Sequence, residues 1–436
     1  MSSSHFNVEV HKVPSQHVRQ YPGATLEDQE DVLYLELKHY RPLSNPNPKA
    51  GDVTIIAAHA NGFPKELYEP LWDELAQRAS RNGFAIRGIW IADVSHQGAS
   101  GVLNEDKTGN DPSWFDHPRD LLHIINLFRG EMPRPLIGIG HSLGASQLAQ
   151  LSLIHPRLLS TLVLLDAVAV HTPPPSTRPT PHQASAFRRD FWPSRAEAED
   201  SFRKSKFYQR WDSRVLNLWL QHGLRPTPTP LFPAHVTSTS GSSASSDTGP
   251  VTLKTPKHQE VFTFQRPNFH GQDPATGALI INRVTHPDLD PAIDGTSALY
   301  RPEPILIMKN LPNLRPSVLY IFGGSSELST PKLRADKMAE TGVGMSGSGG
   351  AKEGRVQQVV LEGVGHLVAM EAVVECAENA ARWVGSEMRR WREEDATFRK
   401  EWGKLGRREK TTLSDEWREK VGGDPRLGAK AGTEKL

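Results

Sequence analysis

The stretch Gly138-Ile139-Gly140-His141-Ser142-Leu143-Gly144 contains the pattern Gly-x-Ser-x-Gly, with an apolar run before it and a helical pattern after it. Between a strand and a helix, this pattern is typical of a sharp turn that presents a serine as a nucleophile. The turn is so tight that the residues two before and two after the serine must be small, as Gly140 and Gly144 are. We therefore predict that Ser142 is a nucleophile and that the helix N-terminus behind it stabilises negative charge.

Strand and helix patterns alternate along the chain around this turn. Apolar strand patterns cover residues 53–58, 86–92, 136–139 and 162–165, after two β-rich runs at 6–13 and 32–40. Helical patterns lie between them at 71–79, 115–128 and 145–154. Continuous apolar strands separated by helices indicate a parallel sheet that is covered on both faces. The sequence therefore predicts an α/β fold with a mostly parallel central sheet and helices on both faces.

A long interruption divides this alternation. The core is expected over residues 1–169 and again over 317–385, and 170–316 is interpreted as a large cap inserted between strands 6 and 7. Within the cap, 227–250 has a Thr-Pro repeat and a serine-glycine run that cannot form a core, so a disordered, flexible loop is expected there. A charged helical tail follows over 386–436, and it either contacts a partner, such as the second subunit of a homodimer, or is solvated.

Composition excludes several classes of protein. The net charge of +1 gives no global field for nucleic acid. The single cysteine, Cys376, rules out an internal disulfide and fits a reducing compartment. The start of the chain has no apolar segment typical of a secretory signal, and no run of about 18 apolar residues predicts a membrane span. No metal or organic cofactor is implied by any motif.

The last three residues, Glu434-Lys435-Leu436, are similar to the Ser-Lys-Leu signal that a peroxisomal import receptor binds. The glutamate departs from the small residue expected at that position. Two interpretations therefore stand side by side, a peroxisomal protein and an accidental tail on a cytoplasmic one.

A serine hydroxyl attacks only after a base takes its proton, and an acid must orient that base. His366 lies in the run Gly-Val-Gly-His-Leu of residues 363–367, directly after the strand pattern at 356–361. This places it on the loop after the last strand, so we predict that His366 is the base.

The residues alone leave two candidates for the acid. Asp166 directly follows the strand at 162–165. Glu327 follows the next strand of the sheet, beside a position where serine stands in place of the more common aspartate. The residues do not decide between them, because an aspartate directly after such a strand often only caps a loop.

Attack on an acyl carbon also requires N–H groups that bind the oxyanion. One donor is expected to be the amide of Leu143, the residue after the nucleophile. The second should come from the loop after the strand at 53–58, which reads His-Ala-Asn-Gly-Phe-Pro over residues 59–64. Asn61 is our prediction for this second donor.

Five segments together resemble a group of fungal α/β-hydrolases, namely residues 59–75, 104–107, 113–142, 299–304 and 363–367. The group includes peroxisomal acyl-CoA thioesterases of mycophenolic acid biosynthesis and hydrolases of host-selective toxin biosynthesis. The resemblance implies the α/β-hydrolase fold and a triad of Ser142, Asp166 and His366, so it favours Asp166 over Glu327. It also lends weight to peroxisomal import.

The resemblance implies hydrolysis of an acyl-CoA thioester to a free acid and CoA in fungal secondary metabolism. Aromatic residues of the cap would hold the acyl group, and cationic residues between 188 and 210 would meet the CoA phosphates. Two alternatives remain open. One is a carboxylester hydrolase or lipase that uses the same triad, and the other is a noncatalytic homologue that binds a small ligand.

Overall fold

The computed structural model describes residues 4–172, 180–234, 249–295, 297–422 and 424. It divides into two compact units, Met1–Glu387 and Met388–Leu436. Most of the loop predicted at 227–250 lies outside the described residues, and so does the C-terminal tripeptide. On the described flank of that loop, the N–H of Thr227 donates to the carbonyl of Pro250 at 3.0 Å.

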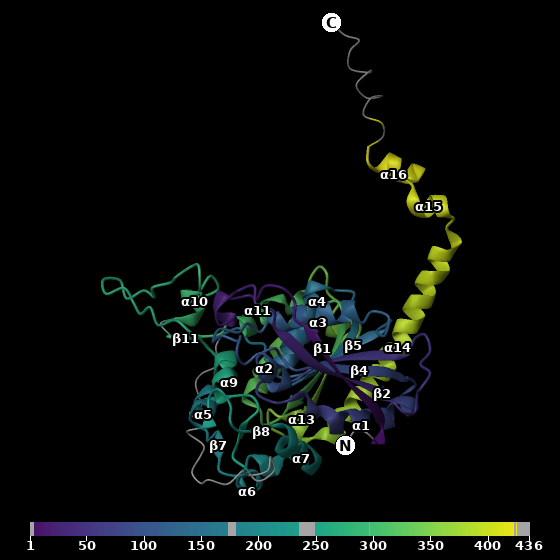
Figure 1. The fold of residues 1–436 in the computed structure, drawn as a ribbon. Coiled ribbons are helices and arrows are strands. Elements are labelled where there is room, and N and C mark those ends of the chain that lie inside the picture. The colour runs from purple at the N-terminus through teal and green to yellow at the C-terminus, as the bar shows by residue number, and fades with distance from the viewer. Residues whose placement is uncertain (1–3, 173–179, 235–248, 296, 423, 425–436) are drawn as a thin grey trace. The chain divides into compact units, whose positions relative to one another are not determined.

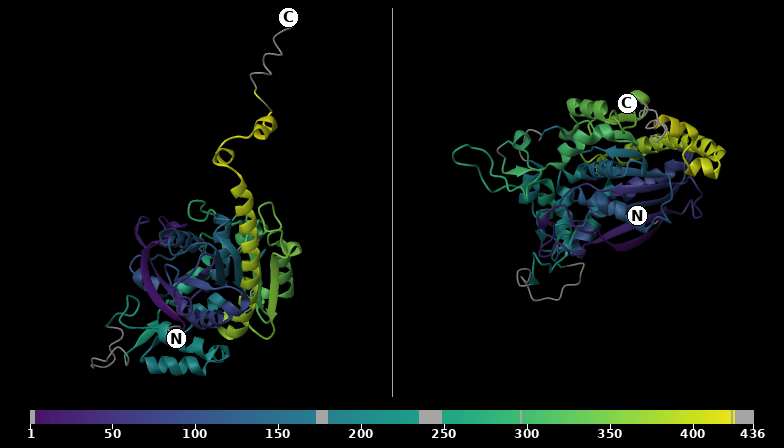
Figure 2. Two further views of the ribbon diagram at one scale, coloured as in Figure 1. Left: turned by 90° about the vertical axis from the view of Figure 1, so that its right-hand side faces the viewer. Right: turned by 90° about the horizontal axis from the view of Figure 1, so that it is seen from above.

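An eight-stranded sheet forms the centre of the first unit (Figure 1), in the order β1-β2-β4-β3-β5-β6-β12-β13. The pairs β1–β2 and β2–β4 are antiparallel and all others are parallel, so the predicted mostly parallel sheet is confirmed. The strands are β1 Phe6–Pro14, β2 Tyr34–Pro42, β3 Val53–Ala58, β4 Ile86–Ala92, β5 Leu136–His141, β6 Leu159–Leu165, β12 Ser317–Gly323 and β13 Val356–Leu361. Figure 2 shows β1, in purple, at the outer edge of this sheet.

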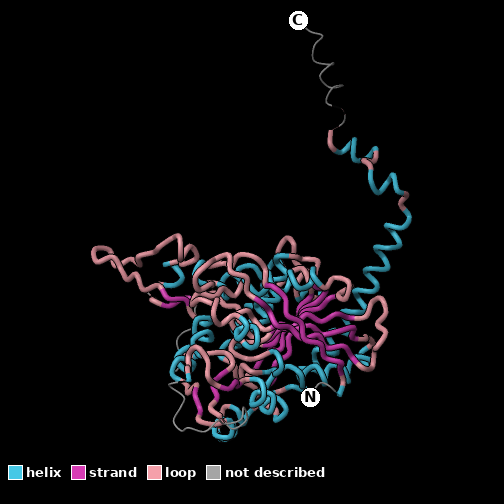
Figure 3. The backbone as a smooth tube through the Cα atoms, in the orientation of Figure 1, coloured by secondary structure: helices cyan, strands magenta, loops and turns pink. Residues whose placement is uncertain are grey.

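Helices cover both faces of the sheet, as Figure 3 shows for the helices around the central strands. Residues of α3, α4 and α11 form one hydrophobic cluster with one face of the sheet, whereas α1 buries Leu71, Trp72 and Leu75. The helices of this core are α1 Glu69–Ala79, α2 Gly98–Leu103, α3 Asp116–Leu127, α4 Leu143–Ile154, α11 Glu303–Asn310, α12 Pro331–Glu340 and α13 Val368–Glu371. The helix α14 spans Val373–Lys404, and its first part, up to Glu387, also belongs to this unit. Every residue of β3 is buried, which explains its continuous apolar pattern.

The segment interpreted as a cap contains short helices and two small sheets between β6 and β12. Its elements are α5 Pro181–Phe187, β7 Phe191–Trp192, α6 Arg195–Lys204, α7 Ser213–His222, β8 Leu224–Pro226, β9 Val251–Leu253, α9 Lys257–Phe264, β10 Arg266–Pro267, α10 Pro291–Asp294 and β11 Leu299–Tyr300. The helix α11, which the sequence placed inside the 170–316 cap, instead packs Ile307 and Met308 into the main core. The bounds of the cap stay a prediction.

The second unit contains the rest of α14, then α15 Arg407–Thr411 and α16 Asp415–Lys420. Its described surface exposes Phe398, Trp402 and Trp417. The dimer role predicted for 386–436 stays a prediction. Among the helices that the structure describes, none is both long enough and apolar enough to cross a membrane.

Candidate active site

Ser142 lies on the turn between β5 and α4, with φ of 54° and ψ of −115°. Positive φ is uncommon for a residue other than glycine, and such strain is concentrated at functional sites. A Cβ atom at Gly144 would lie 2.2 Å from the carbonyl oxygen of Ala58, and one at Gly140 would lie 2.6 Å from that of Gly144. The two glycines therefore allow the helix to approach the sheet closely enough for the turn to form.

The structure brings Ser142, His366 and Asp166 together in one hydrogen-bonded series. Ser142 Oγ is 2.7 Å from His366 Nε2, and His366 Nδ1 is 2.6 Å from Asp166 Oδ2. A carboxylate accepts only, so the proton of the neutral imidazole lies on Nδ1 and Nε2 is left to accept from the serine. This is the tautomer that a histidine needs to act as the base for a serine.

The environment of Asp166 keeps its carboxylate charged. Burial alone would raise the pKa of Asp166, but the hydrogen bond and charge of His366 and the hydroxyls of Ser326 and Ser329 hold this pKa below its ordinary value. Ser326 Oγ donates to Oδ2 at 2.5 Å, and both Ser329 Oγ and the N–H of Gly323 donate to Oδ1. The ionised form of Asp166 is thus matched by four donors.

Glu327, the alternative acid, begins the short turn 327–329 and is exposed. The neighbouring Ser326 points instead toward Asp166. Of the two candidates that the residues left open, the geometry places Asp166 against His366 Nδ1.

The first predicted oxyanion donor is the backbone N–H of Leu143. Leu143 is the first residue of α4, where an N–H has no acceptor within its own helix. Among the residues that the structure describes, its N–H has no hydrogen-bond acceptor. The helix dipole adds partial positive charge at the same place, which favours a developing oxyanion next to Ser142.

The second predicted donor, the N–H of Asn61, also has no acceptor within the described parts of the chain. The side chain of Asn61 is fully engaged: its Oδ1 accepts from Gln97 Nε2 at 2.7 Å, and its Nδ2 donates to the carbonyl of Glu260 at 3.0 Å. Gln97 also accepts the N–H of Gly62 at 2.8 Å. These hydrogen bonds hold the loop in place, and the backbone N–H of Asn61 stays available to bind an oxyanion.

The cap contacts both loops that flank Ser142. The ring of Phe63, two residues after Asn61, packs edge-on against Trp211 and Trp219, with ring centroids 5.5 and 5.9 Å apart. In the other loop, Arg210 Nη2 lies 3.4 Å from the carbonyl of Gly363. Ser142 itself is buried, with 7% of its surface exposed.

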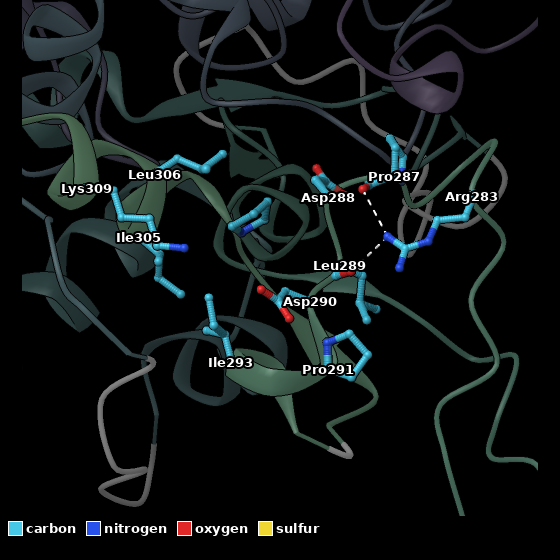
Figure 4. A pocket seen from close by; sticks show the side chains of 11 residues that line it. Arg283, Pro287, Asp288, Leu289, Asp290, Pro291, Ile293, Ile305, Leu306 and Lys309 are labelled. Atoms are coloured by element: carbon cyan, nitrogen blue, oxygen red, sulfur yellow. Dashed lines mark hydrogen bonds between the residues drawn. The ribbon is translucent and has the colours of Figure 1, made fainter.

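A separate pocket of about 430 Å³ lies within residues 283–309 and contains none of the predicted site residues. Figure 4 shows Arg283 directed toward the backbone of residues 287–289, and its Nη1 donates to the carbonyls of Pro287 and Leu289 at 3.3 and 3.4 Å. Residues of both charges line this pocket, among them Asp288 and Lys309.

Sequence reasoning missed several residues that hold the site together. They are Tyr68, Gln97, His141, Ser326 and Ser329. Tyr68 lies in a segment that carried the family resemblance, and His141 is adjacent to Ser142, but nothing in the sequence showed that these two side chains meet.

Comparison with known proteins gives relatives over nearly the whole chain. A profile of the alpha/beta hydrolase family matches residues 55–379. The chain is 43% identical over 409 residues to the type I acyl-CoA thioesterase mpaH of Penicillium roqueforti, and 92% of each chain is covered. It is 29% identical over 255 residues to the abhydrolase domain-containing protein AKT2 of Alternaria alternata, which covers 58% of this chain and 84% of AKT2.

Among solved structures, the peroxisomal alpha-beta-hydrolase Lpx1 of Saccharomyces cerevisiae superposes with a TM-score of 0.64 and 18% identity, and 99% of each chain is covered. At this identity the similarity concerns the fold alone. The fold class and the resemblance predicted from the sequence are both confirmed.

Proposed function

The chain belongs to the alpha/beta hydrolase family, and on that premise we propose that it is a serine hydrolase that cleaves acyl-CoA thioesters into a free acid and CoA. The observation that carries the proposal is the series Ser142–His366–Asp166, with its contacts of 2.7 and 2.6 Å. These groups in this order activate a hydroxyl for attack on an acyl carbon. The thioester part rests on the 43% identity to the Penicillium thioesterase.

In the proposed first step, His366 Nε2 takes the proton of Ser142 as Oγ attacks the thioester carbon. The N–H groups of Leu143 and Asn61 bind the oxyanion that forms. Asp166 holds the imidazole in the required tautomer and stabilises the imidazolium, without becoming protonated itself. The carbon–sulfur bond then breaks, and His366 returns the proton to the leaving sulfur.

In the second step, water replaces CoA next to His366. The imidazole takes a proton from this water, the hydroxide attacks the acyl carbon, and the bond to Ser142 Oγ breaks. The proton passes back to Oγ, so the enzyme returns to its starting state and the acid is released. No cofactor is required for either step.

A panel of three substrates with one acyl group tests the thioesterase proposal. The panel contains the acyl-CoA, the N-acetylcysteamine thioester, which keeps the thioester bond without the nucleotide, and the ethyl ester. We expect kcat/KM for the acyl-CoA to exceed that for the short thioester by about 10- to 100-fold, since the nucleotide adds binding energy. The ethyl ester is expected to react more slowly than both.

The same panel separates the alternatives. If the ethyl ester and the acyl-CoA are hydrolysed with equal kcat/KM, the carboxylester hydrolase is the correct function and the thioesterase proposal is wrong. Ser142→Ala must be inactive toward all three substrates, because turnover that survives this change comes from a contaminating enzyme.

The cationic run of the cap is largely engaged in ion pairs within the protein. Arg188 pairs with Glu260 at 2.8 Å and Arg189 with Glu197 at 2.5 Å. Arg210 pairs with Glu371 at 2.6 Å, with half of its own side chain exposed. Exposed pairs contribute little stability, so a multiply charged phosphate can compete for such an arginine. Binding of the CoA phosphates at this run is therefore a proposal that requires these pairs to open.

We also propose import into peroxisomes, on the basis of the terminal Lys435-Leu436. A fluorescent fusion that ends with Glu434-Lys435-Leu436 is expected to show punctate signal that coincides with a peroxisomal marker. Removal of residues 434–436 should make the signal diffuse. A diffuse signal from both fusions would instead favour the cytoplasmic alternative.

A further inference from the structure

A buried series of hydrogen bonds connects the two loops on either side of Ser142. The N–H of Ala60, in the loop of the second oxyanion donor, donates to Tyr68 Oη at 2.8 Å. Tyr68 Oη is 3.0 Å from His141 Nδ1. His141 Nε2 is in turn 3.1 Å from the carbonyl oxygen of His366. Tyr68 and His141 are almost completely buried, so water does not compete for these bonds.

Donor and acceptor chemistry gives this series a single direction. A carbonyl oxygen only accepts, so His141 Nε2 carries the proton and donates to His366. His141 Nδ1 is then the acceptor for the hydroxyl of Tyr68, whose oxygen accepts from Ala60. Burial, together with the nearby charge of His366, lowers the pKa of His141 to about 3, so this imidazole is neutral at pH 7. Every donor and every acceptor in the series thus has one partner, and the hydroxyl of Tyr68 acts as both.

We propose that Tyr68 and His141 are positioning residues. They hold the oxyanion loop (residues 59–64) and the loop of the base His366 at fixed positions relative to Ser142. The proposal rests on the serine hydrolase function and adds two residues outside the triad. His141 would fix the backbone that carries His366. Tyr68 would fix the backbone that precedes Asn61.

The geometry of the peptide before Asn61 explains why this matters for catalysis. The carbonyl of Ala60 and the N–H of Asn61 belong to one planar peptide group, so fixing the carbonyl aims the N–H. The N–H of Val94 donates to His59 Nε2 at 2.9 Å, which leaves His59 Nδ1 protonated to donate to the carbonyl of Ala60 at 2.8 Å. Tyr68 anchors the other side of Ala60. An oxyanion donor stabilises the transition state only when it is aligned in advance.

Tyr68→Phe tests the oxyanion end of the series, because it removes one hydroxyl and keeps the ring. We expect kcat for a p-nitrophenyl ester to fall by about 10- to 100-fold with little change in KM, as a donor shifts out of line. The rate of inactivation by a fluorophosphonate should fall in parallel, since this reagent also develops an oxyanion. The matched control is Tyr320→Phe, which removes an equally buried hydroxyl that bonds Thr341 away from the site. That control is expected to keep kcat within about twofold while losing similar thermal stability.

His141→Gln and His141→Asn separate the two hydrogen bonds that His141 makes in the series. The terminal amide of glutamine can still donate to the carbonyl of His366 but offers no acceptor at the place of Nδ1, so it breaks the link to Tyr68. Asparagine keeps that acceptor and breaks the link to His366. Tyr68→Phe and His141→Gln both break the bond between Tyr68 and His141, and Tyr68→Phe also removes the acceptor of the Ala60 N–H. Because the bonds lie in one series, the double variant is expected to lose no more kcat than the worse single variant. If Tyr68→Phe does not fold, His141→Gln serves as the test of this link.

The outcomes separate this proposal from the function on which it rests. If wild type fails to react with the fluorophosphonate, the serine hydrolase function is wrong, and the positioning role is wrong with it. If wild type reacts and Tyr68→Phe matches Tyr320→Phe in kcat, the function stands and the positioning role is overturned. Multiplicative losses in the double variant would likewise overturn it, because they would mean that the two side chains act independently.

Discussion

Ser142→Ala is expected to lower kcat by about 10⁶-fold, because it removes the atom that forms the acyl intermediate. After this substitution, only the oxyanion donors and substrate binding still accelerate the reaction, so most of the rate enhancement is lost. KM, or the Kd for a nonhydrolysable acyl-CoA thioether, should change little, since the substitution removes one buried oxygen. Steady-state turnover of an acyl-CoA and equilibrium binding of the thioether measure the two effects separately.

Ser146→Ala is the matched control for this change. Ser146 lies one turn further along α4 and is equally buried, but its Oγ donates to the carbonyls of Ser142 and Val168 and not to the base. A fluorophosphonate probe should label wild type and Ser146→Ala, and it should leave Ser142→Ala unlabelled. Labelling that survives in Ser142→Ala would identify another nucleophile, and an unlabelled wild type would favour the noncatalytic ligand-binding homologue.

The turn around Ser142 and the sheet on either side were predictable because both depend on neighbouring residues. Glycines at 140 and 144 are required locally, and β5 ends and α4 begins on either side of the serine as the pattern indicates. The position of His366 beside Ser142 was predictable for a topological reason. The carboxyl ends of parallel strands lie at one edge of the sheet, so the loop after β13 reaches the turn.

The acid could not be chosen from the residues alone. Asp166 follows β6 and Glu327 follows β12, and these strands are neighbours in the sheet, so both carboxylates begin at the same edge. What distinguishes them is the path of the loop after β12, which directs the hydroxyls of Ser326 and Ser329 inward onto Asp166 and leaves Glu327 exposed. That path depends on tertiary packing, and the family resemblance was needed to favour Asp166.

The positioning series was beyond prediction for a related reason. Tyr68 and His141 are 73 residues apart, and His141 and the carbonyl of His366 are 225 apart. A tyrosine or histidine in a buried segment is more often a packed core residue than a link between loops. Only the folded arrangement shows that Tyr68 Oη has two hydrogen-bond partners and that each ring nitrogen of His141 has one.

Asp166→Asn is expected to lower kcat by about 10⁴-fold while the protein remains folded. The amide group can present an N–H to His366 Nδ1, which then favours the tautomer with its proton on Nε2, where it cannot accept from Ser142. Glu327→Gln, the matched control on the alternative acid, should keep kcat within about twofold, since exposed substitutions away from a site have small effects. The pair of kcat values decides between the two carboxylates that the sequence left open.

Ser326→Asp offers a second and stricter test, because Ser326 Oγ and His366 Nδ1 bind the same oxygen of Asp166. A carboxylate at position 326 would therefore lie within reach of the imidazole of His366 in a protein in which asparagine replaces Asp166. We expect Asp166→Asn/Ser326→Asp to recover about 10²-fold of the lost activity, which corresponds to about 2.7 kcal/mol of transition-state stabilisation. Ser326→Asp alone should destabilise the protein, because it brings two buried carboxylates together and raises the pKa of one. If the double variant stays as inactive as Asp166→Asn, a carboxylate at 326 cannot orient His366, and the geometry that ties Ser326 to the base is wrong.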